Sequence, residues 1–233
     1  MKTFHHLVAG PLVACGLALI AMPANALTIS AGDIPGNNTV NFYDGGSWSA
    51  TSSPRNFQSK TFNGATGLGV AGGFVDGEID LADNEQIAFN FTTPQTLDQI
   101  TLAFMYPAGV YGDSVSEVAR VQLATGGFVA GDLSVIDATH ATWSGPGGGA
   151  VINVSPAVSN SAGVWEVQNP FGDTPVTGLS MYALQVGGQP ASAANSDFSF
   201  VSLAGTDVPE PASLALLLSG VLGLGTLRRR KGA

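Results

Sequence analysis

Large apolar side chains occupy every second position in two stretches near the middle of the chain, Ile87–Phe91 and Ile100–Phe104. Alternation with a period of two places these side chains on one face of a β-strand and the intervening residues on the other face. The segment between the two stretches, Thr93-Pro94-Gln95, is typical of a turn or short connection. The pattern therefore predicts two strands, each with one buried face.

Similar short apolar stretches recur over residues 27–203, separated by Gly, Asn, Asp, Ser, Thr and Pro, and the chain contains 31 glycines. Long helical patterns are missing from the sequence outside its two termini. This patterning favours an all-β domain of about ten short strands, which we expect to form an antiparallel β-sandwich of jelly-roll-like form. A β-helix is the alternative, but the sequence has no repeat of fixed period.

The same alternation gives the other strand predictions. Leu179–Val186 carries apolar residues on both faces and is typical of a strand buried on both sides. Residues 64–73 are rich in glycine and favour a loop or a bulged edge. The remaining predicted strands are Thr28–Ile34, Val40–Phe42, Ser47–Ala50, Phe57–Phe62, Ala119–Leu123, Leu133–Ile136, Ala150–Val154, Val164–Val167 and Phe198–Val201.

The N-terminal segment Met1–Ala26 has the organisation of a secretory signal peptide. Lys2 supplies a small positive region, and Leu7–Met22 is mostly apolar. Ala24 and Ala26 fit the small-x-small rule for cleavage, so we expect signal peptidase to cut after Ala26.

A lipoprotein is the competing interpretation, because Leu12–Cys15 looks like a lipobox. Cleavage before Cys15 would leave the strongly apolar stretch Gly16–Met22 at the mature N-terminus and a very short apolar region upstream. Cleavage after Ala26 would instead remove the only cysteine of the chain. The mature protein would then have no disulfide, although export delivers it to a permissive compartment.

The C-terminal segment Ala212–Leu227 has no charged side chain and is slightly shorter than the roughly 17–25 residues of a membrane-spanning helix. Prolines precede it, in Pro209-Glu210-Pro211, and a basic cluster follows it: Arg228, Arg229, Arg230 and Lys231. Since proline suits only a first helical turn and cations remain cytoplasmic, we predict a linker over 204–211, a transmembrane helix over 212–227 and a basic cytoplasmic tail over 228–233. A buried C-terminal helix of a soluble domain is the alternative, although the segment is not amphipathic.

Val208-Pro209-Glu210-Pro211, the apolar run and the basic cluster together resemble the PEP-CTERM sorting signal of Gram-negative surface proteins. The resemblance implies that an exosortase, a membrane protease, recognises Pro209, Glu210 and Pro211 and releases the protein from its helix. It also implies a transient stay in the inner membrane before delivery to the cell surface or the medium. The same tail is sometimes labelled after ice-binding proteins, but the sequence has no regular Thr-x-Thr ladder, so we do not infer ice binding.

The segment between the two targeting signals, Leu27–Pro211, is strongly acidic. It contains only three cations, Arg55, Lys60 and Arg120, against all 17 acids of the chain, which gives a formal charge of −14. Such a surface argues against nucleic acid as a partner, because phosphates require basic patches. It repels anionic polysaccharide unless divalent cations bridge the two, and it also keeps a secreted protein soluble.

The densest group of acids lies just before the first alternating stretch: Asp76, Glu78, Asp80, Asp83 and Glu85. In an extended segment, Asp76, Glu78 and Asp80 would point to one side. Carboxylate oxygens suit calcium, so we predict a calcium site at these three residues, with Asp113 and Glu117 as further candidate ligands. The twelve-residue spacing of an EF-hand is absent. A solvated acidic turn is the alternative.

Catalytic patterns are weak. His140 is the only histidine left after signal removal, and no Gly-x-Ser-x-Gly elbow is present. A glycosidase needs two carboxylates in a cleft, and no pair stands out among the acids. Gly67–Gly72 has the letters of a dinucleotide-binding loop, but no helix start follows it.

Aromatic side chains of an exposed loop could stack on sugar rings, and Tyr106 and Tyr111 are the best candidates. We therefore expect a non-enzymatic structural or adhesive protein of the cell surface, extracellular matrix or biofilm. A calcium-dependent carbohydrate-binding module, with extracellular polysaccharide as its partner, is the first alternative. A secreted hydrolase is the second.

Overall fold

The computed structural model describes residues 25–36, 40–124, 127–156, 163–187 and 196–208, and Ala24–Val208 form one compact unit. Within this described part the chain forms thirteen β-strands and one short 3₁₀-helix, and every strand pairing is antiparallel. The all-β, antiparallel prediction is confirmed. The same part contains no helix that is long and apolar enough to cross a membrane. The predicted signal peptide up to Ala24 and the predicted helix over 212–227 lie outside the described residues.

The elements follow one another as β1 (Ala26–Ser30), η1 (Ala31–Asp33), β2 (Asn41–Tyr43), β3 (Trp48–Ser53), β4 (Phe57–Phe62), β5 (Ala65–Val70), β6 (Gln86–Ala103), β7 (Val118–Leu123), β8 (Ala130–Val135), β9 (Ala141–Trp143), β10 (Val151–Asn153), β11 (Trp165–Gln168), β12 (Val176–Ala183) and β13 (Ser199–Asp207).

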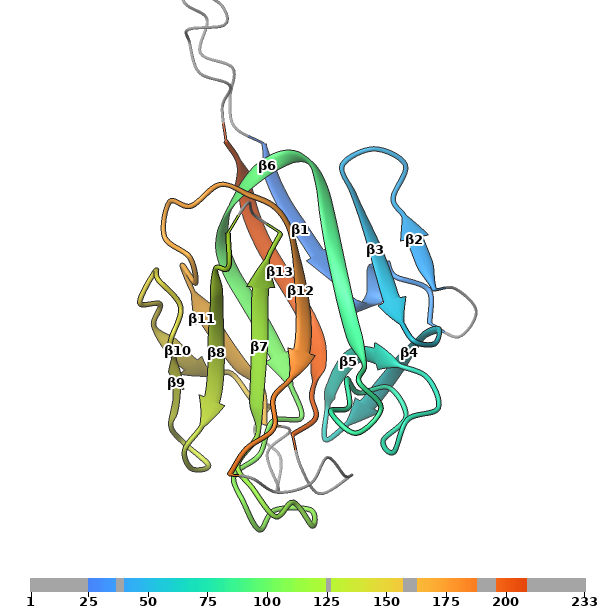
Figure 1. The fold of residues 1–233 in the computed structure, drawn as a ribbon, viewed down its shortest axis with the longest axis vertical. Helices are drawn as coiled ribbons and strands as arrows, with labels where there is room; N and C mark the ends of the chain where they lie inside the picture. Colours follow the sequence, from blue (N-terminus) through green and yellow to red (C-terminus); the bar gives the residue numbers. More distant parts are fainter. Residues whose placement is uncertain (1–24, 37–39, 125–126, 157–162, 188–195, 209–233) are drawn as a thin grey trace, which may run out of the picture. The chain divides into compact units, whose positions relative to one another are not determined.

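The long strand β6 joins the two halves of the sheet. It replaces the predicted pair of strands and runs without interruption through Pro94, so the predicted turn at Thr93-Pro94-Gln95 is wrong. Figure 1 shows β6 curving over one end of the molecule. Pro94 lies between the last residue paired with β3, Phe91, and the first paired with β13, Gln95. Because proline has no N–H to donate, it is tolerated where the strand changes partners.

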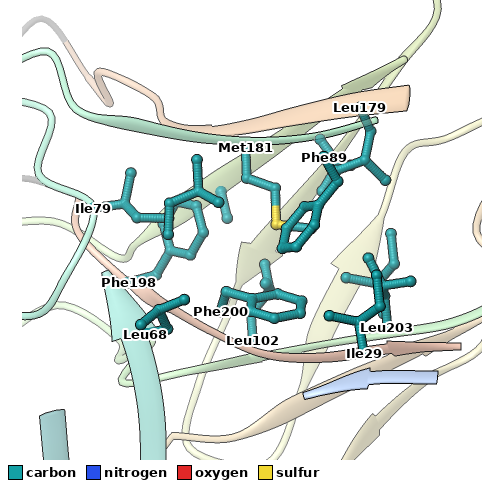
Figure 2. Close-up of a cluster of buried hydrophobic side chains, with 14 of the residues drawn as sticks. Ile29, Leu68, Ile79, Phe89, Leu102, Leu179, Met181, Phe198, Phe200 and Leu203 are labelled. Atoms are coloured by element: carbon teal, nitrogen blue, oxygen red, sulfur yellow. The ribbon is translucent and has the colours of Figure 1, made fainter. Parts of the chain in front are cut away.

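The two halves of the sheet form two layers around one core. One layer has the order β2-β3-β6-β12-β7-β8-β9, and the other contains β4, β5, β13, the second half of β6, β11 and β10, with β1 on β13. Side chains of the two layers point toward one another (Figure 2), and the rings of Phe89 and Phe200 have centroids 4.8 Å apart. Burial of these large apolar side chains is the main stabilising contribution to the fold.

Strand β5 corrects the prediction of a loop or bulged edge over residues 64–73. It pairs with β4 along its whole length and meets β13 at Leu68. Its glycines allow close packing: a Cβ on Gly67 would lie 2.4 Å from the Cβ of Ser199, and one on Gly69 would lie 2.4 Å from the backbone of Glu78. Gly67 and Gly69 are therefore residues of β5, and their missing side chains let neighbouring segments pack closely against this strand.

Several other predicted strands have different bounds in the structure, and the first strand and the one predicted over Leu179–Val186 are examples. The first ends at Ser30, where the Asp33 carboxylate accepts hydrogen bonds from the Ser30 N–H and hydroxyl and begins η1. The strand predicted over Leu179–Val186 is β12, which starts and ends earlier. It is not buried on both faces, because Thr177 is exposed and Tyr182 is half-buried.

The last strand runs further than predicted. Residues 204–207, which we assigned to the linker, continue β13 and pair with β6 through Asp207. The first strand, β1, pairs with the same part of β13, from Ala26 opposite Thr206 to Ser30 opposite Ser202. The backbone N–H of Val208 donates to the Pro94 carbonyl at 2.9 Å. Both ends of the domain therefore lie side by side.

Candidate functional site

The acidic segment between β5 and β6 is a series of turns, and the extended conformation predicted for it is wrong. Asp76 is exposed and accepts a hydrogen bond from the Gly72 N–H at 2.7 Å. Glu78 and Asp80 are buried, and the carboxylate of Asp80 accepts from the Val75 N–H at 3.0 Å. Asp76 thus closes a local turn, while the other two predicted calcium ligands lie inside the protein.

Asp80 belongs to a group that we call the Arg55 cluster, formed by Asp80, Asp83, Glu85 and Arg55. One oxygen of each carboxylate lies within 4.8 Å of the others. The Arg55 guanidinium donates to Glu85 and, at 3.1 Å, to Asp83. Burial raises the pKa of Glu85 to about 7, although the Asp80 N–H and Arg55 act in the opposite direction. The guanidinium already supplies a positive charge to this group.

A second group, which we call the acid cluster, is formed by Glu78, Asp113, Glu117 and Asp197. The carboxyl groups of this cluster lie within hydrogen-bonding reach in three pairs: Glu78 with Asp197, Asp197 with Glu117, and Glu117 with Asp113. Glu117 is fully buried, Glu78 and Asp197 are buried, and Asp113 is half-buried. Two ionised carboxylates only accept hydrogen bonds, so each contact needs a proton or a cation between its oxygens.

Backbone hydrogen bonds bring three distant segments together around the acid cluster. The Ile79 N–H donates to the Phe198 carbonyl at 2.6 Å, which places Glu78 beside Asp197. Ile79 and Phe198 themselves point into the core (Figure 2). The Val118 N–H donates to the Ser196 hydroxyl at 3.0 Å, which joins the segment of Glu117 to the same place.

Glu117 is held by Tyr106. The Tyr106 N–H donates to Oε2 of Glu117 at 2.6 Å, and the Glu117 N–H donates to the Tyr106 carbonyl at 3.1 Å. Oε1 of Glu117 is buried and accepts no hydrogen bond from an N–H or O–H group of the described residues. The hydroxyl of Tyr106 is likewise buried without a hydrogen-bond partner there.

One lysine faces the acid cluster. The Lys60 ammonium forms an ion pair with Glu78 and lies 5.0 Å from the centroid of the Phe104 ring. Burial and then the Glu78 charge raise the pKa of Asp197 to about 9. Burial also raises the pKa of Glu117 well above its ordinary value, and the charge of Asp197 adds to this effect. A single ammonium is too little positive charge for four carboxylates linked in a row.

An apolar pocket of about 370 Å³ lies next to this region. The rings of Tyr106 and Tyr111 meet edge to face with centroids 4.8 Å apart. Tyr111 is 52% exposed, as predicted for a sugar-binding ring, whereas Tyr106 is only 8% exposed. The residues that line the pocket are Met105, Tyr106, Pro107, Val110, Tyr111, Ala138, Gly163 and Trp165.

His140 has only local polar contacts among the described residues. Its Nδ1 lies 2.9 Å from Asp137 and 3.0 Å from the Thr139 hydroxyl, and its side chain is 71% exposed. The Asp137 carboxylate also accepts from the Thr139 and His140 N–H groups, which is the pattern of an Asx turn. These contacts account for the histidine as part of a surface turn.

Sequence reasoning missed Asp197 and Lys60 as members of a site. It named Asp113 and Glu117 as possible additions to the acidic segment. The structure brings Glu117 near Glu78 and Asp113 to Glu117, whereas Asp76 closes a turn with Gly72. The available signal for Asp197 was an acid immediately before a strongly apolar strand, Phe198–Val201. Such an acid is unusual at a buried strand end unless something pairs with it.

The fold and the tail together define a class: an antiparallel all-β domain carrying a sorting signal at its C-terminal end. The family model of the PEP-CTERM protein-sorting motif matches residues 207–231. The match contains Pro209, Glu210, Pro211 and the basic cluster, so the resemblance seen in the sequence is confirmed. The motif marks a protein that is exported and processed by an exosortase. Neither the curated proteins nor the solved structures searched contain a match.

Proposed function

We propose that the chain is a surface or extracellular-matrix protein of a Gram-negative bacterium, whose jelly-roll-like sandwich has a non-enzymatic structural or adhesive role. The observation that carries this proposal is the overlap of the sorting motif with the end of the domain. The motif begins at residue 207, the last residue of β13, and Val208 is still hydrogen-bonded to Pro94. The folded domain therefore leads directly into the sorting signal and is its cargo.

The route has three steps. Signal peptidase removes the N-terminal segment at Ala24-Asn25-Ala26, the helix over 212–227 holds the chain in the inner membrane, and an exosortase acts at Pro209-Glu210-Pro211. The cluster Arg228–Lys231 keeps the tail in the cytoplasm. The acidic domain then reaches the outside without its basic tail.

The arrangement of the acids supports a non-enzymatic role. A glycosidase needs two carboxylates that flank a substrate in an open cleft. The acid cluster contains facing carboxylates, but Glu117 has no exposed surface. The described residues that line the 370 Å³ pocket include no acid.

The test follows the protein in a bacterium that carries an exosortase. The wild-type chain should reach the cell surface or medium without the segment that follows the motif, as shown by fractionation, immunoblotting and intact mass. A variant with Pro209→Ala, Glu210→Ala and Pro211→Ala should remain full-length in the inner membrane. Ser213→Ala, just after these three residues, is the matched control and should be sorted normally. Normal processing of the triple variant would refute exosortase sorting.

Calcium-dependent carbohydrate binding is the second candidate, and the half-exposed Tyr111 beside the pocket favours it. Rings at a pocket edge can stack on the faces of sugar rings. A glycan array probed with and without calcium tests this function. Binding that needs calcium and is lost in Tyr111→Ala supports it, whereas an array without signal in both conditions refutes it.

A further inference from the structure

We infer that the acid cluster of Glu78, Asp113, Glu117 and Asp197 is a binding site for a hard divalent cation, and that calcium is the ion it fits. This site differs from the predicted group of Asp76, Glu78 and Asp80, with which it shares only Glu78. The inference concerns the fold of the exported domain and does not depend on the sorting route or on carbohydrate binding.

The acid cluster carries more negative than positive charge. Its four carboxylates are linked in a row by three pairwise contacts, and Lys60 is the only cation paired with them among the described residues. Burying several like charges without compensation is strongly unfavourable, so such groups keep protons or bind a metal. A divalent cation would offset most of the remaining negative charge. It would also replace the protons that the three carboxyl–carboxyl contacts otherwise need.

One buried oxygen of the acid cluster has no hydrogen-bond partner among the described residues. Glu117 has no exposed surface, and its Oε1 accepts no N–H or O–H hydrogen bond from the described residues. Its other oxygen is fixed by the Tyr106 N–H, and the carboxyl group contacts both Asp113 and Asp197. The Glu117 carboxylate, which carries Oε1, is therefore directed into the acid cluster. Buried polar atoms are nearly always satisfied in folded proteins, so a missing bond here points to a ligand.

The Arg55 cluster is a weaker candidate for the same ion. Among the described residues it is the one group of three acids in which an oxygen of each lies within 4.8 Å of the others, but the Arg55 guanidinium already donates to both Asp83 and Glu85. The Asp80 N–H also donates to Glu85 at 2.9 Å. Donors of the protein itself therefore satisfy this group, whereas Glu117 in the acid cluster retains an unused oxygen.

The ligand chemistry selects calcium. All four side chains offer only oxygen, which disfavours zinc and the softer transition metals. Calcium accepts about six to eight oxygens in irregular arrangements, and carboxylates bind it with one oxygen or two. Magnesium requires near-octahedral geometry and retains several waters, which a site around a fully buried glutamate cannot easily provide.

The ion would connect parts of the chain that are far apart in sequence. Glu78 follows β5, Glu117 precedes β7, and Asp197 precedes β13. The mature chain is expected to have no disulfide, so an ion at this place would act as its cross-link. An ion that binds only the folded state raises the free energy of unfolding, and well above Kd the increase grows with the logarithm of the ion concentration.

The experiment measures thermal unfolding of the full-length chain, purified in detergent and freed of metal with EDTA. Calcium chloride is then added up to about 10 mM, because sites of extracellular modules have Kd values of roughly 10⁻⁴–10⁻³ M. We expect Tm to rise by roughly 5–10 °C at 100 times Kd. Magnesium chloride at the same concentration should produce a clearly smaller shift.

Two variants locate the ion. Glu117→Gln and Asp197→Asn keep side-chain shape and remove one charge each. The amide that Glu117→Gln introduces can donate to the neighbouring carboxylates, so this variant should have a Tm in EDTA at least as high as that of the wild type. Both variants should lose most of the calcium response. Asp83→Asn, in the Arg55 cluster, is the matched control and should keep it.

Each outcome decides the proposal. A wild-type Tm that is the same in EDTA and in calcium overturns it. A calcium shift that persists in both cluster variants, or that disappears in Asp83→Asn alone, places the ion elsewhere and also overturns it. If one variant fails to fold, as judged by circular dichroism, the other still decides. Sorting is measured separately, so a negative calcium result leaves the proposed route standing.

Discussion

The side-chain amide of Asn25 donates a hydrogen bond to Oδ2 of Asp207 at 3.1 Å, and the Asp207 N–H donates to the Asn25 carbonyl at 2.9 Å. These bonds join the start of the described domain to the end of β13. The predicted signal-peptide cleavage site after Ala26 therefore lies beside Asp207, the residue at which the match to the sorting motif begins. Cleavage after Ala26 would remove Asn25 and leave Asp207 with its other partners, Thr93 and Gln95.

Asp207 should contribute to the stability of this end of the domain. In Asp207→Ala the Thr93 hydroxyl loses its acceptor and the Gln95 amide loses one of its acceptors, so we expect Tm to fall by about 2–4 °C. Differential scanning calorimetry at pH 7 is the measurement, and the exposed Asp173→Ala is the control. Hydrogen bonds from Gln95, Thr93 and Asn25 lower the pKa of Asp207. Its contribution should thus be present above the unfolded pKa and should disappear as the pH falls through the folded pKa. Equal Tm values for the variant and the control would refute this role.

Glu85 should make the protein less stable as the pH rises from about 4.5 to about 7. Burial raises its pKa from 4.5 to about 7 in the folded state. Between these values the folded protein keeps a proton that the unfolded chain has lost, so the free energy of unfolding decreases with pH. The decrease attributable to Glu85 is on the order of 1–3 kcal/mol. Above pH 7 both states are ionised and its contribution no longer changes.

Urea unfolding at pH 5 and pH 8 tests whether the free energy of unfolding decreases with pH as predicted. The wild type should lose more stability between the two pH values than Glu85→Gln, whose amide cannot titrate. Arg55 can still donate to the amide oxygen of the variant. Asp83→Asn, whose carboxylate also binds Arg55 but is partly exposed, is the control and should behave like the wild type. A pH dependence that is identical in Glu85→Gln and the wild type would exclude Glu85 as its source.

The core itself can be tested at Phe200. This residue is fully buried, pairs with Leu68 and Leu102 through its backbone, and packs its ring against Phe89. Phe200→Ala should reduce the free energy of unfolding by about 3–5 kcal/mol, because it leaves a cavity between the two layers. Chemical denaturation measures the loss, and Phe128→Ala, at a 70% exposed ring, should cost far less.

The strands with regular alternation could be predicted from the sequence, because a strand with one buried face alternates apolar and polar side chains. The apolar positions of β6 and β7 form one buried face, so their period of two is directly visible. The connection at Pro94 could not be predicted in this way. Local preference alone suggests a turn where a proline separates two apolar stretches. In the structure the chain continues as one strand, because its first part pairs with β3 in one layer and its second part pairs with β13 in the other.

The acids illustrate a different limit. Spacing along the chain predicted that Asp76, Glu78 and Asp80 act together, because an extended segment was assumed. In the structure Gly77 has a φ of 85° and turns the chain between Asp76 and Glu78. The partners of Glu78 then come from positions 39 and 119 residues further along. Only the pairing of three segments brings these carboxylates together, and no local pattern contains that information.

Gly69 lies in β5 directly against the backbone of Glu78. A Cβ at this position would be 2.4 Å from the N, Cα and C atoms of Glu78. Backbone atoms cannot move aside as a flexible side chain can, so Gly69→Ala must displace the segment that carries Glu78. We expect a loss of about 1–3 kcal/mol in the free energy of unfolding.

Gly46→Ala is the matched control for Gly69→Ala, because a Cβ there would have no neighbour within 4 Å. Both substitutions add one methyl group and reduce the freedom of the unfolded chain by the same amount. Denaturant unfolding of the two variants therefore isolates the steric effect. If Gly69→Ala is as stable as Gly46→Ala, the close approach of β5 to Glu78 is not a constraint on this fold. If it is less stable by the expected amount, the glycine pattern of residues 64–73 is explained by packing against the segment that carries the acids.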